Sequence, residues 1–220
     1  MTDFRQQRTN MVESQVRPSD ITDRRIITAM LEIPREVFAP EAIAYMDGTV
    51  PVAPRAAEGP ARYLLAPRTF AKMVQLAEIE PTSVVLDVGC ATGYSTAVLA
   101  RLAKAVVAVE VDAALAARAA RCLRQLGIEN ALVIEGPLTA GAPGHAPFDA
   151  ILLNGAVWQV PQALLEQLRD GGRLVAVQAE GAFGRAQVWR RTATVVDAVA
   201  AFDAGAEPLP GFARKAEFSL

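Results

Sequence analysis

The sequence is poor in the residues that build metal centres and disulfide frameworks. It contains two cysteines, Cys90 and Cys122, and a single histidine among 220 residues. Two thiols cannot form a disulfide framework or a four-thiolate zinc site, so we expect no metal centre. A chain of this length buries a core large enough to fold without either kind of cross-link.

Net charge and long apolar runs are also scarce. The 22 Lys and Arg residues nearly balance the 24 Asp and Glu residues, which leaves a formal net charge of −2. This balance argues against a nucleic-acid binder that works through a broad positive field. No stretch reaches the roughly 18 apolar residues that a membrane-spanning helix needs. With no signal-peptide pattern at the N-terminus, these absences predict a cytoplasmic protein without nucleic-acid or membrane partners.

The chain changes character near Pro81, which predicts a helical extension over residues 1–80 and an α/β domain over residues 81–220. Residues 48–67 are rich in proline and glycine, so we expect a long loop there. Apolar residues at helical spacing predict a helix over 20–31, with Ser19 or Asp20 as its N-cap. A second helix is expected over 70–77.

After Pro81, short apolar runs alternate with helical segments. Continuous apolar strands separated by helices of about 10–15 residues are typical of a parallel sheet covered on both faces. We therefore predict a doubly wound, mostly parallel α/β sheet whose ligand lies beyond the carboxyl ends of the strands. The expected strands are 84–88, 106–109, 131–134, 148–153 and 173–178, with two more within 186–202, and the expected helices are 94–104, 112–126 and 161–169.

A turn of small residues follows the first strand of this domain. A dinucleotide-binding turn of the type Gly-x-Gly-x-x-Gly would need glycine at positions 89, 91 and 94, to turn tightly and approach a pyrophosphate. The chain has Gly89 but places Ala91 and the bulky Tyr94 at the other two positions. A pyrophosphate cradle is therefore poorly supported, which disfavours an NAD-dependent dehydrogenase.

A different spacing fits the same turn. Asp87, Gly89, Ala91 and Gly93 match the pattern acid-x-Gly-x-Gly/Ala-x-Gly, which resembles the first motif of class I S-adenosylmethionine-dependent methyltransferases. Glu110 ends the next strand, 21 residues after Gly89. A carboxylate at about that distance is placed to accept hydrogen bonds from ribose hydroxyls. The negative charge of Asp87 would lie near the ammonium or sulfonium of the cofactor.

A closer resemblance extends over most of the chain. Residues 16–40, 44–51, 84–94 and 147–178 are similar, in order and spacing, to segments of the protein-L-isoaspartate O-methyltransferase family. The tail Glu207-Pro208-Leu209-Pro210 is a weaker match to the family's C-terminal edge. The resemblance implies transfer of a methyl group from S-adenosyl-L-methionine to the carboxylate of an isoaspartyl protein or peptide.

The resemblance also implies where the cofactor lies. The glycine turn, the end of the second strand and the loops after the third and fourth strands would form its site. An acceptor carboxylate is already ionised at neutral pH, so His145 is not required as a base and is expected on a surface loop. The expected cofactor-binding residues are Asp87, Gly89, Cys90, Ala91, Gly93, Tyr94, Glu110, Val111, Gly136, Pro137, Leu138 and Asn154.

Two positions depart from the family's pattern. The family has Ser-x-Pro on the substrate side, whereas this chain has Leu65 and Pro67. Thr49 and Thr69 are the nearest hydroxyls in the sequence, and the hydroxyl of Tyr63 is a further candidate. The family also has Gly-Asp after its third strand, where this chain has Gly136-Pro137, and proline removes both a carboxylate and a backbone donor.

Three alternatives remain open from the sequence. The acceptor is an isoaspartyl carboxylate, or it is another peptide or small molecule that suits the apolar stretch at Leu64 and Leu65. A third reading is a non-catalytic protein that keeps the fold and binds a ligand or a partner. Cys90 is interpreted as a small residue that fits the turn, against the alternative of a thiol sensitive to the cofactor. Both a monomer and a homodimer are compatible with the sequence.

Overall fold

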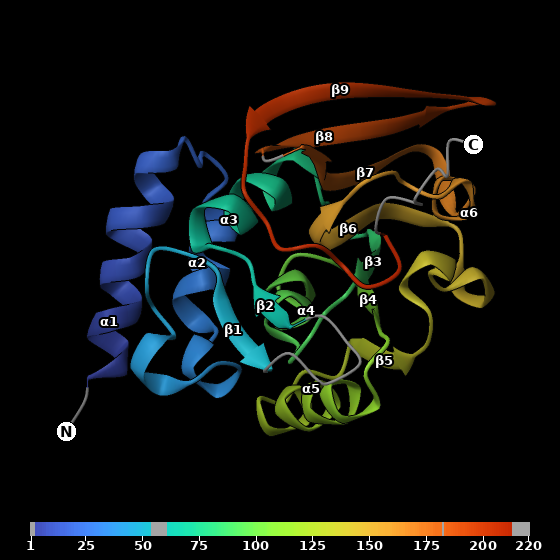
Figure 1. Cartoon of the computed structure of the whole chain (residues 1–220). Helices are drawn as coiled ribbons and strands as arrows, with labels where there is room; N and C mark the ends of the chain where they lie inside the picture. The colour runs from blue at the N-terminus through green and yellow to red at the C-terminus, as the bar shows by residue number, and fades with distance from the viewer. Residues whose placement is uncertain (1–2, 54–60, 182, 213–220) are drawn as a thin grey trace, which may run out of the picture.

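The computed structural model describes residues 3–53, 61–181 and 183–212. Its centre is a seven-stranded sheet with the order β5-β4-β3-β6-β7-β8-β9 (Figure 1). The first five strands of that order run parallel, and the β8 and β9 strands are antiparallel to their neighbours. Their bounds are β3 Val84–Val88, β4 Ala105–Glu110, β5 Ala131–Glu135, β6 Phe148–Val157, β7 Leu168–Glu180, β8 Phe183–Thr192 and β9 Val195–Asp203.

Helices and a small second sheet surround this core. A two-stranded antiparallel sheet of β1 and β2 joins the N-terminal helices to the main sheet. No helix among residues 3–53, 61–181 and 183–212 has the length and apolar character to cross a bilayer. The bounds are α1 Phe4–Met11, α2 Arg24–Glu32, β1 Val50–Ala53, β2 Arg62–Leu64, α3 Pro67–Leu76, α4 Tyr94–Ala100, α5 Ala113–Gln125 and α6 Gln162–Leu165.

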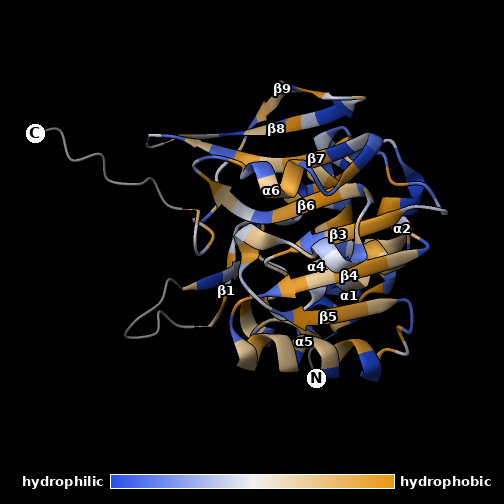
Figure 2. Cartoon of the chain, turned by 90° about the vertical axis from the view of Figure 1, so that its right-hand side faces the viewer, coloured by the Kyte–Doolittle hydropathy of each residue, from blue (hydrophilic) through white to orange (hydrophobic). Residues whose placement is uncertain are grey.

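Strand side chains alternate between the two faces of the main sheet, because successive residues of a strand point in opposite directions. On one face, Val85 and Val106 belong to a core cluster that includes residues of the α1 to α5 helices. On the other face, Leu86 and Val107 pack with residues of α6 and of the C-terminal segment, such as Leu164. The central strands are accordingly hydrophobic almost throughout (Figure 2). This arrangement is the expected doubly wound α/β fold.

The order of the strands reverses direction between β3 and β6. From β3 the chain moves outward to β4 and β5, then returns to place β6 on the other side of β3. The carboxyl ends of β3 and β6 therefore form the topological switch point, where open α/β sheets bind ligands. Asp87 lies at this edge, next to the last residue of β3. Asn154 on β6 lies at the same edge and donates a hydrogen bond to Asp87.

The N-terminal part differs from the sequence prediction in two details. The predicted N-cap at Ser19 or Asp20 is wrong, because the carboxylate of Asp23 accepts the hydrogen bond from Arg25 N and α2 begins at Arg24. The predicted loop 48–67 is also wrong in part, since it contains β1 and β2. Proline and glycine concealed these strands because turn-forming residues flank and interrupt such short apolar runs.

The α/β part keeps every predicted strand but shifts several boundaries. The helix expected over 94–104 ends at Ala100, and that expected over 161–169 is only Gln162–Leu165. Leu168 already pairs with Phe148, so β7 begins before Gly171 rather than after it. Pairing with a neighbouring strand overrides local helix propensity at such a boundary.

After β9 the chain returns to the switch point. Glu207 and Leu209 exchange backbone hydrogen bonds with Ala156 at 2.8 and 2.9 Å, and Pro208 forms a parallel bridge with the same residue. Figure 1 shows this segment, in red, running from β9 back across the front of the sheet. The last described residues thus lie beside the end of β6.

Candidate functional site

Asp87 is the polar interruption of an otherwise apolar buried strand. Its Oδ2 atom accepts hydrogen bonds from Ser95 at 2.8 Å and Thr96 at 2.6 Å, and its Oδ1 atom accepts one from Asn154 at 2.5 Å. Burial raises the pKa of Asp87, an effect that these three hydrogen bonds oppose and the nearby charge of Glu110 adds to. The sheet thus holds a buried carboxylate at its switch point.

The turn after β3 depends on backbone conformations that favour small residues. Gly89, Ala91 and Gly93 have φ angles of 75°, 51° and 95°, in the left-handed region. A Cβ atom on Gly93 would lie 3.0 Å from the Cβ of Ala119, so glycine also allows α5 to pack closely. Cys90 is buried inside this turn, and burial first, then the charges of Asp87 and Glu110, raise the pKa of its thiol.

Glu110 has a fully buried side chain and a saturated carboxylate. Its Oε2 atom accepts hydrogen bonds from Arg62 Nη2 and Ala91 N, both at 2.7 Å. Its Oε1 atom accepts from Val111 N at 3.0 Å and Asp112 N at 3.3 Å. A carboxylate offers about four acceptor positions, so Glu110 uses all of them within the chain.

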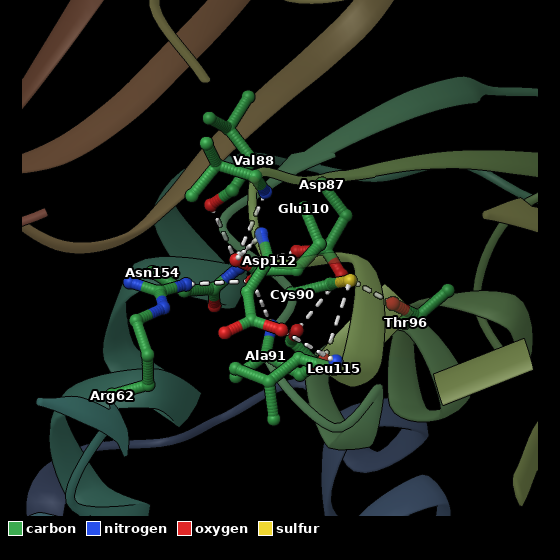
Figure 3. Close-up of polar contacts among 12 residues, drawn as sticks. Arg62, Asp87, Val88, Cys90, Ala91, Thr96, Glu110, Asp112, Leu115 and Asn154 are labelled. Carbon is green, nitrogen blue, oxygen red and sulfur yellow. Dashed lines mark hydrogen bonds and ion pairs between the residues drawn. The ribbon is translucent and has the colours of Figure 1, made fainter. Parts of the chain in front are cut away.

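Arg62 and Leu209 lie directly over the glycine turn. A Cβ atom built on Gly89 would lie 2.8 Å from Leu209 Cδ2 and 3.2 Å from Arg62 Nη2. Figure 3 shows Arg62 reaching from β2 towards the cluster formed by Glu110 and Asp87. The sequence predicts that a ligand approaches the backbone of this turn closely. In the structure, the side chains of Arg62 and Leu209 make that close approach.

The remaining predicted cofactor residues line the same edge in different ways. Asn154 donates to Asp87 and to the carbonyl of Val88. Leu138 is buried and lies near Gly89, whereas Val111 is 43% exposed. Gly136 N donates to the carbonyl of Glu110, and Pro137 follows it on the surface. The structure thus brings the predicted residues to one edge of the sheet.

Tyr94 and Arg35 form the wall next to the substrate-side residues. The guanidinium of the fully buried Arg35 lies 4.5 Å from the ring centroid of Tyr94 and donates to the carbonyls of Ala44 and Leu65. Arg35 Nη1 and the Tyr94 hydroxyl have no hydrogen-bond partner among the described residues. The carbonyl of Leu65 accepts the hydrogen bond from Arg35 and so fixes the backbone there. The aliphatic side chain of Leu65 is buried.

The other substrate-side candidates lie around Leu65. Tyr63 is partly exposed on β2, and Pro67 is the first residue of α3. Thr69 is buried in α3, whereas Thr49 is partly exposed and borders the same small cavity as Tyr63. His145 is exposed in a short turn before β6, as expected for a surface loop residue.

The space at this edge is narrow. Two cavities of about 10 Å³ each lie at this edge; one is bordered by Arg62, Asn154 and Leu209, and the other by Arg35 and Gly89 of the turn. A larger cavity of about 580 Å³ lies further along β7 and β8, between Ala156, Phe183 and Asp203. Among the residues that border it, none is a predicted cofactor residue.

The donor set of this edge fits an S-adenosyl ligand. Glu110 supplies acceptors suited to ribose hydroxyls, Asp87 supplies negative charge for a sulfonium or ammonium group, and the glycines permit close approach. The space over Gly89 is occupied by Arg62 and Leu209, so accommodation requires both side chains to move. Sequence reasoning missed Arg62, because its strand was interpreted as a loop and no burial pattern was assigned to it.

The fold and this edge define the protein as a class I S-adenosylmethionine-dependent methyltransferase. The family model described as protein-L-isoaspartate(D-aspartate) O-methyltransferase matches residues 6–200. The chain therefore belongs to the protein-L-isoaspartate O-methyltransferase family.

Individual relatives and solved structures agree with this assignment. The chain is 39% identical to protein-L-isoaspartate O-methyltransferase 1 of Syntrophobacter fumaroxidans over 178 residues, which is 80% of each protein. It is 41% identical to the enzyme of Methanoregula boonei over 172 residues, covering 77% of this chain and 76% of that protein.

A solved protein-L-isoaspartate O-methyltransferase superposes with a TM-score of 0.82 and 25% identity, over 93% of this chain and 66% of that one. A Plasmodium falciparum protein in complex with S-adenosyl-L-homocysteine has the same fold, with a TM-score of 0.76, 20% identity and coverage of 94% and 98%.

Proposed function

We propose that this protein transfers a methyl group from S-adenosyl-L-methionine to the carboxylate of isoaspartyl residues in proteins or peptides. The observation that carries the proposal is the pair of buried carboxylates, Asp87 and Glu110, on either side of a left-handed glycine turn at the switch point. Membership of the family supports the choice of acceptor.

The residues of the edge have separate roles in this proposal. Glu110 would hold the ribose, and Asp87 would attract the cationic end of the cofactor, with Asn154 fixing its orientation. The cofactor supplies an electrophilic methyl group: as the acceptor oxygen bonds to it, the bond from carbon to sulfur breaks and sulfur keeps the electron pair. The protein contributes in-line placement and exclusion of water.

No protein base is needed for this reaction. An acceptor carboxylate has an ordinary pKa near ~4, so it is ionised and nucleophilic at neutral pH. His145 is exposed on the surface, in keeping with a reaction that does not use it.

Leu65 bears on the choice between acceptors. The hydroxyl that the family provides at this position is replaced by a buried aliphatic side chain, which cannot bond a polar substrate. A lost hydrogen bond in a dry site costs about 1–3 kcal/mol. A second acceptor, a peptide or small molecule with an apolar group next to its nucleophile, is favoured by this one observation.

A transfer assay distinguishes the two acceptors. Labelled S-adenosyl-L-methionine is mixed with an isoaspartyl peptide and with the same peptide containing ordinary aspartate. We expect label in the isoaspartyl peptide alone, released by mild alkali as a methyl ester would be. The variant Leu65→Ser should lower the KM for that peptide. Binding of S-adenosyl-L-homocysteine without transfer to either peptide would contradict the proposed acceptor and leave the cofactor site intact.

A further inference from the structure

Arg62 forms an ion pair with Glu110, the carboxylate that the cofactor would need for its ribose. Its side chain is 6% exposed and forms a buried ion pair of 2.7 Å with Glu110, 48 residues away in the sequence. The three other hydrogen bonds to Glu110 come from backbone N–H groups, which the glycine turn and the start of α5 hold in place. Among the donors that the described residues supply to Glu110, Arg62 is therefore the one that can leave by a side-chain rotation.

A ribose hydroxyl cannot donate to a carboxylate whose acceptor positions are all in use, and the departure of Arg62 would free one position. Glu110 accepts four hydrogen bonds, about as many as a carboxylate can. The Arg62 guanidinium also lies over Gly89, where a bound cofactor would approach the backbone. On both counts, binding of the cofactor and pairing of Arg62 with Glu110 exclude each other.

Displacing Arg62 leaves a guanidinium in a nearly dry site without its anion. A buried charge of this kind is unfavourable unless another anion replaces the first. The Nε atom of Arg62 already lacks a hydrogen-bond partner among the described residues, so the side chain has a further donor to offer. Arg62 also borders the same cavity as Tyr63 and Leu65, on the substrate side.

We propose that Arg62 exchanges Glu110 for the carboxylate of the acceptor when the cofactor binds. This inference rests on the proposed function, which supplies both the ribose for Glu110 and a carboxylate as acceptor. Arg62 then determines specificity for an anionic acceptor and makes acceptor binding depend on the cofactor. It also compensates for Leu65, because a guanidinium bonds one carboxylate oxygen while the other remains free to attack.

The test distinguishes the pairing of Arg62 with Glu110 from its pairing with the acceptor carboxylate. Calorimetric titration with S-adenosyl-L-homocysteine is carried out on the wild type and on Arg62→Gln, Arg62→Met and Arg62→Lys. Removal of a competing side chain should tighten binding of S-adenosyl-L-homocysteine about three- to tenfold in Arg62→Gln and Arg62→Met. The KM for an isoaspartyl peptide should rise about tenfold in the same variants, and Arg62→Lys should restore part of it.

A control and a stability readout accompany these measurements. Arg169→Gln removes an exposed arginine that pairs with Asp149 at the opposite end of β6, and should change neither quantity. The Arg62 variants should melt at a lower temperature without ligand, because they leave the buried Glu110 carboxylate without its cationic partner. S-adenosyl-L-homocysteine should raise their melting temperature more than it raises that of the wild type.

Each other outcome has a distinct meaning. Weaker or unchanged binding of S-adenosyl-L-homocysteine by the folded Arg62 variants would overturn the competition at Glu110. Tighter binding with an unchanged KM for the peptide would overturn the exchange to the acceptor. No binding by the wild type or by any variant would overturn the proposed function itself.

Discussion

The chemistry of this protein is concentrated in a few charged side chains that a largely apolar sheet buries. Asp87, Glu110, Arg62 and Arg35 are all buried near the carboxyl ends of β3 and β4. Burial of a charge is unfavourable unless hydrogen bonds or an opposite charge compensate. Asp87 and Glu110 have these partners, whereas Arg35 donates to two backbone carbonyls and lies against the ring of Tyr94. We propose that these charges serve the binding of the cofactor and of the acceptor.

At the residue scale, the variant Asp87→Asn removes the negative charge of this side chain and keeps its shape. The asparagine amide can accept from Asn154 and donate to the hydroxyl of Ser95 or Thr96, so the fold should survive. Binding of S-adenosyl-L-homocysteine should weaken about tenfold, since an attraction of roughly 1–2 kcal/mol to the ammonium group disappears. Calorimetry measures this change. Asp203→Asn, which neutralises a carboxylate that is 87% exposed, is the matched control.

The same variant should alter how stability depends on pH. Burial raises the folded-state pKa of Asp87 above its ordinary value of 3.8. The contribution of Asp87 to the free energy of unfolding is therefore fully present below pH 3.8 and is lost as the pH rises through the raised pKa. Above that window, Asp87→Asn should therefore be at least as stable as the wild type in urea unfolding. A variant that loses stability at pH 7 but not at pH 4 would show that the charged form is the favoured one.

At the scale of elements, the N-terminal helices are tied together by one polar network. The hydroxyl of Tyr45 donates to Glu36 and accepts from Arg8 on α1, whose guanidinium also bonds the carbonyls at the end of α2. Burial, followed by the hydrogen bond to Glu36, raises the pKa of Tyr45 to about 12. The protonated phenol is thus the form that holds these elements together.

Tyr45→Phe tests this network through its pH dependence. Because the folded-state pKa is raised from 10.0 to about 12, the contribution of Tyr45 is complete below pH 10 and is lost as pH rises towards 12. At neutral pH, Tyr45→Phe should lower the free energy of unfolding by about 1 kcal/mol. The difference between the two proteins should shrink between pH 10 and 12. A constant difference in urea unfolding across that range would contradict this assignment.

At the scale of the whole molecule, the extension and the α/β part share one core. A single cluster contains Met11 and Met30 from the N-terminal helices together with Leu99 and Val106 from the sheet side. We propose that residues 1–80 and 81–220 differ in role but unfold together, because neither part buries its apolar face alone.

Unfolding of the wild type should therefore be a single transition. Met30→Ala in the fully buried side of α2 should cost about 2–5 kcal/mol and shift the fluorescence transition of Trp158 and Trp189, which lie outside the extension. Arg24→Ala, on the exposed side of the same helix, should leave it in place. Two separate transitions, with only the first one shifted, would show that the parts fold independently.

The sequence by itself determined the parts of the site that lie close to strand ends. Asp87, Gly89, Gly93 and Glu110 could be placed because a parallel α/β pattern brings successive strand ends to one edge. The short β1 and β2 strands could not be placed, since proline and glycine hide their periodicity. Helix ends such as that of α6 were also beyond local reasoning, because strand pairing at Leu168 decides them.

Only the tertiary structure decided what lies on that edge. Arg62 and Leu209 both reach Gly89, one from before the sheet and one from after it. Their positions follow from the pairing of β1 with β2 and of residues 207–209 with Ala156. Such contacts join residues far apart in the sequence, and no local pattern of polarity specifies them. The sequence therefore determines which groups could hold a cofactor, and long-range packing determines that Glu110 is paired with Arg62.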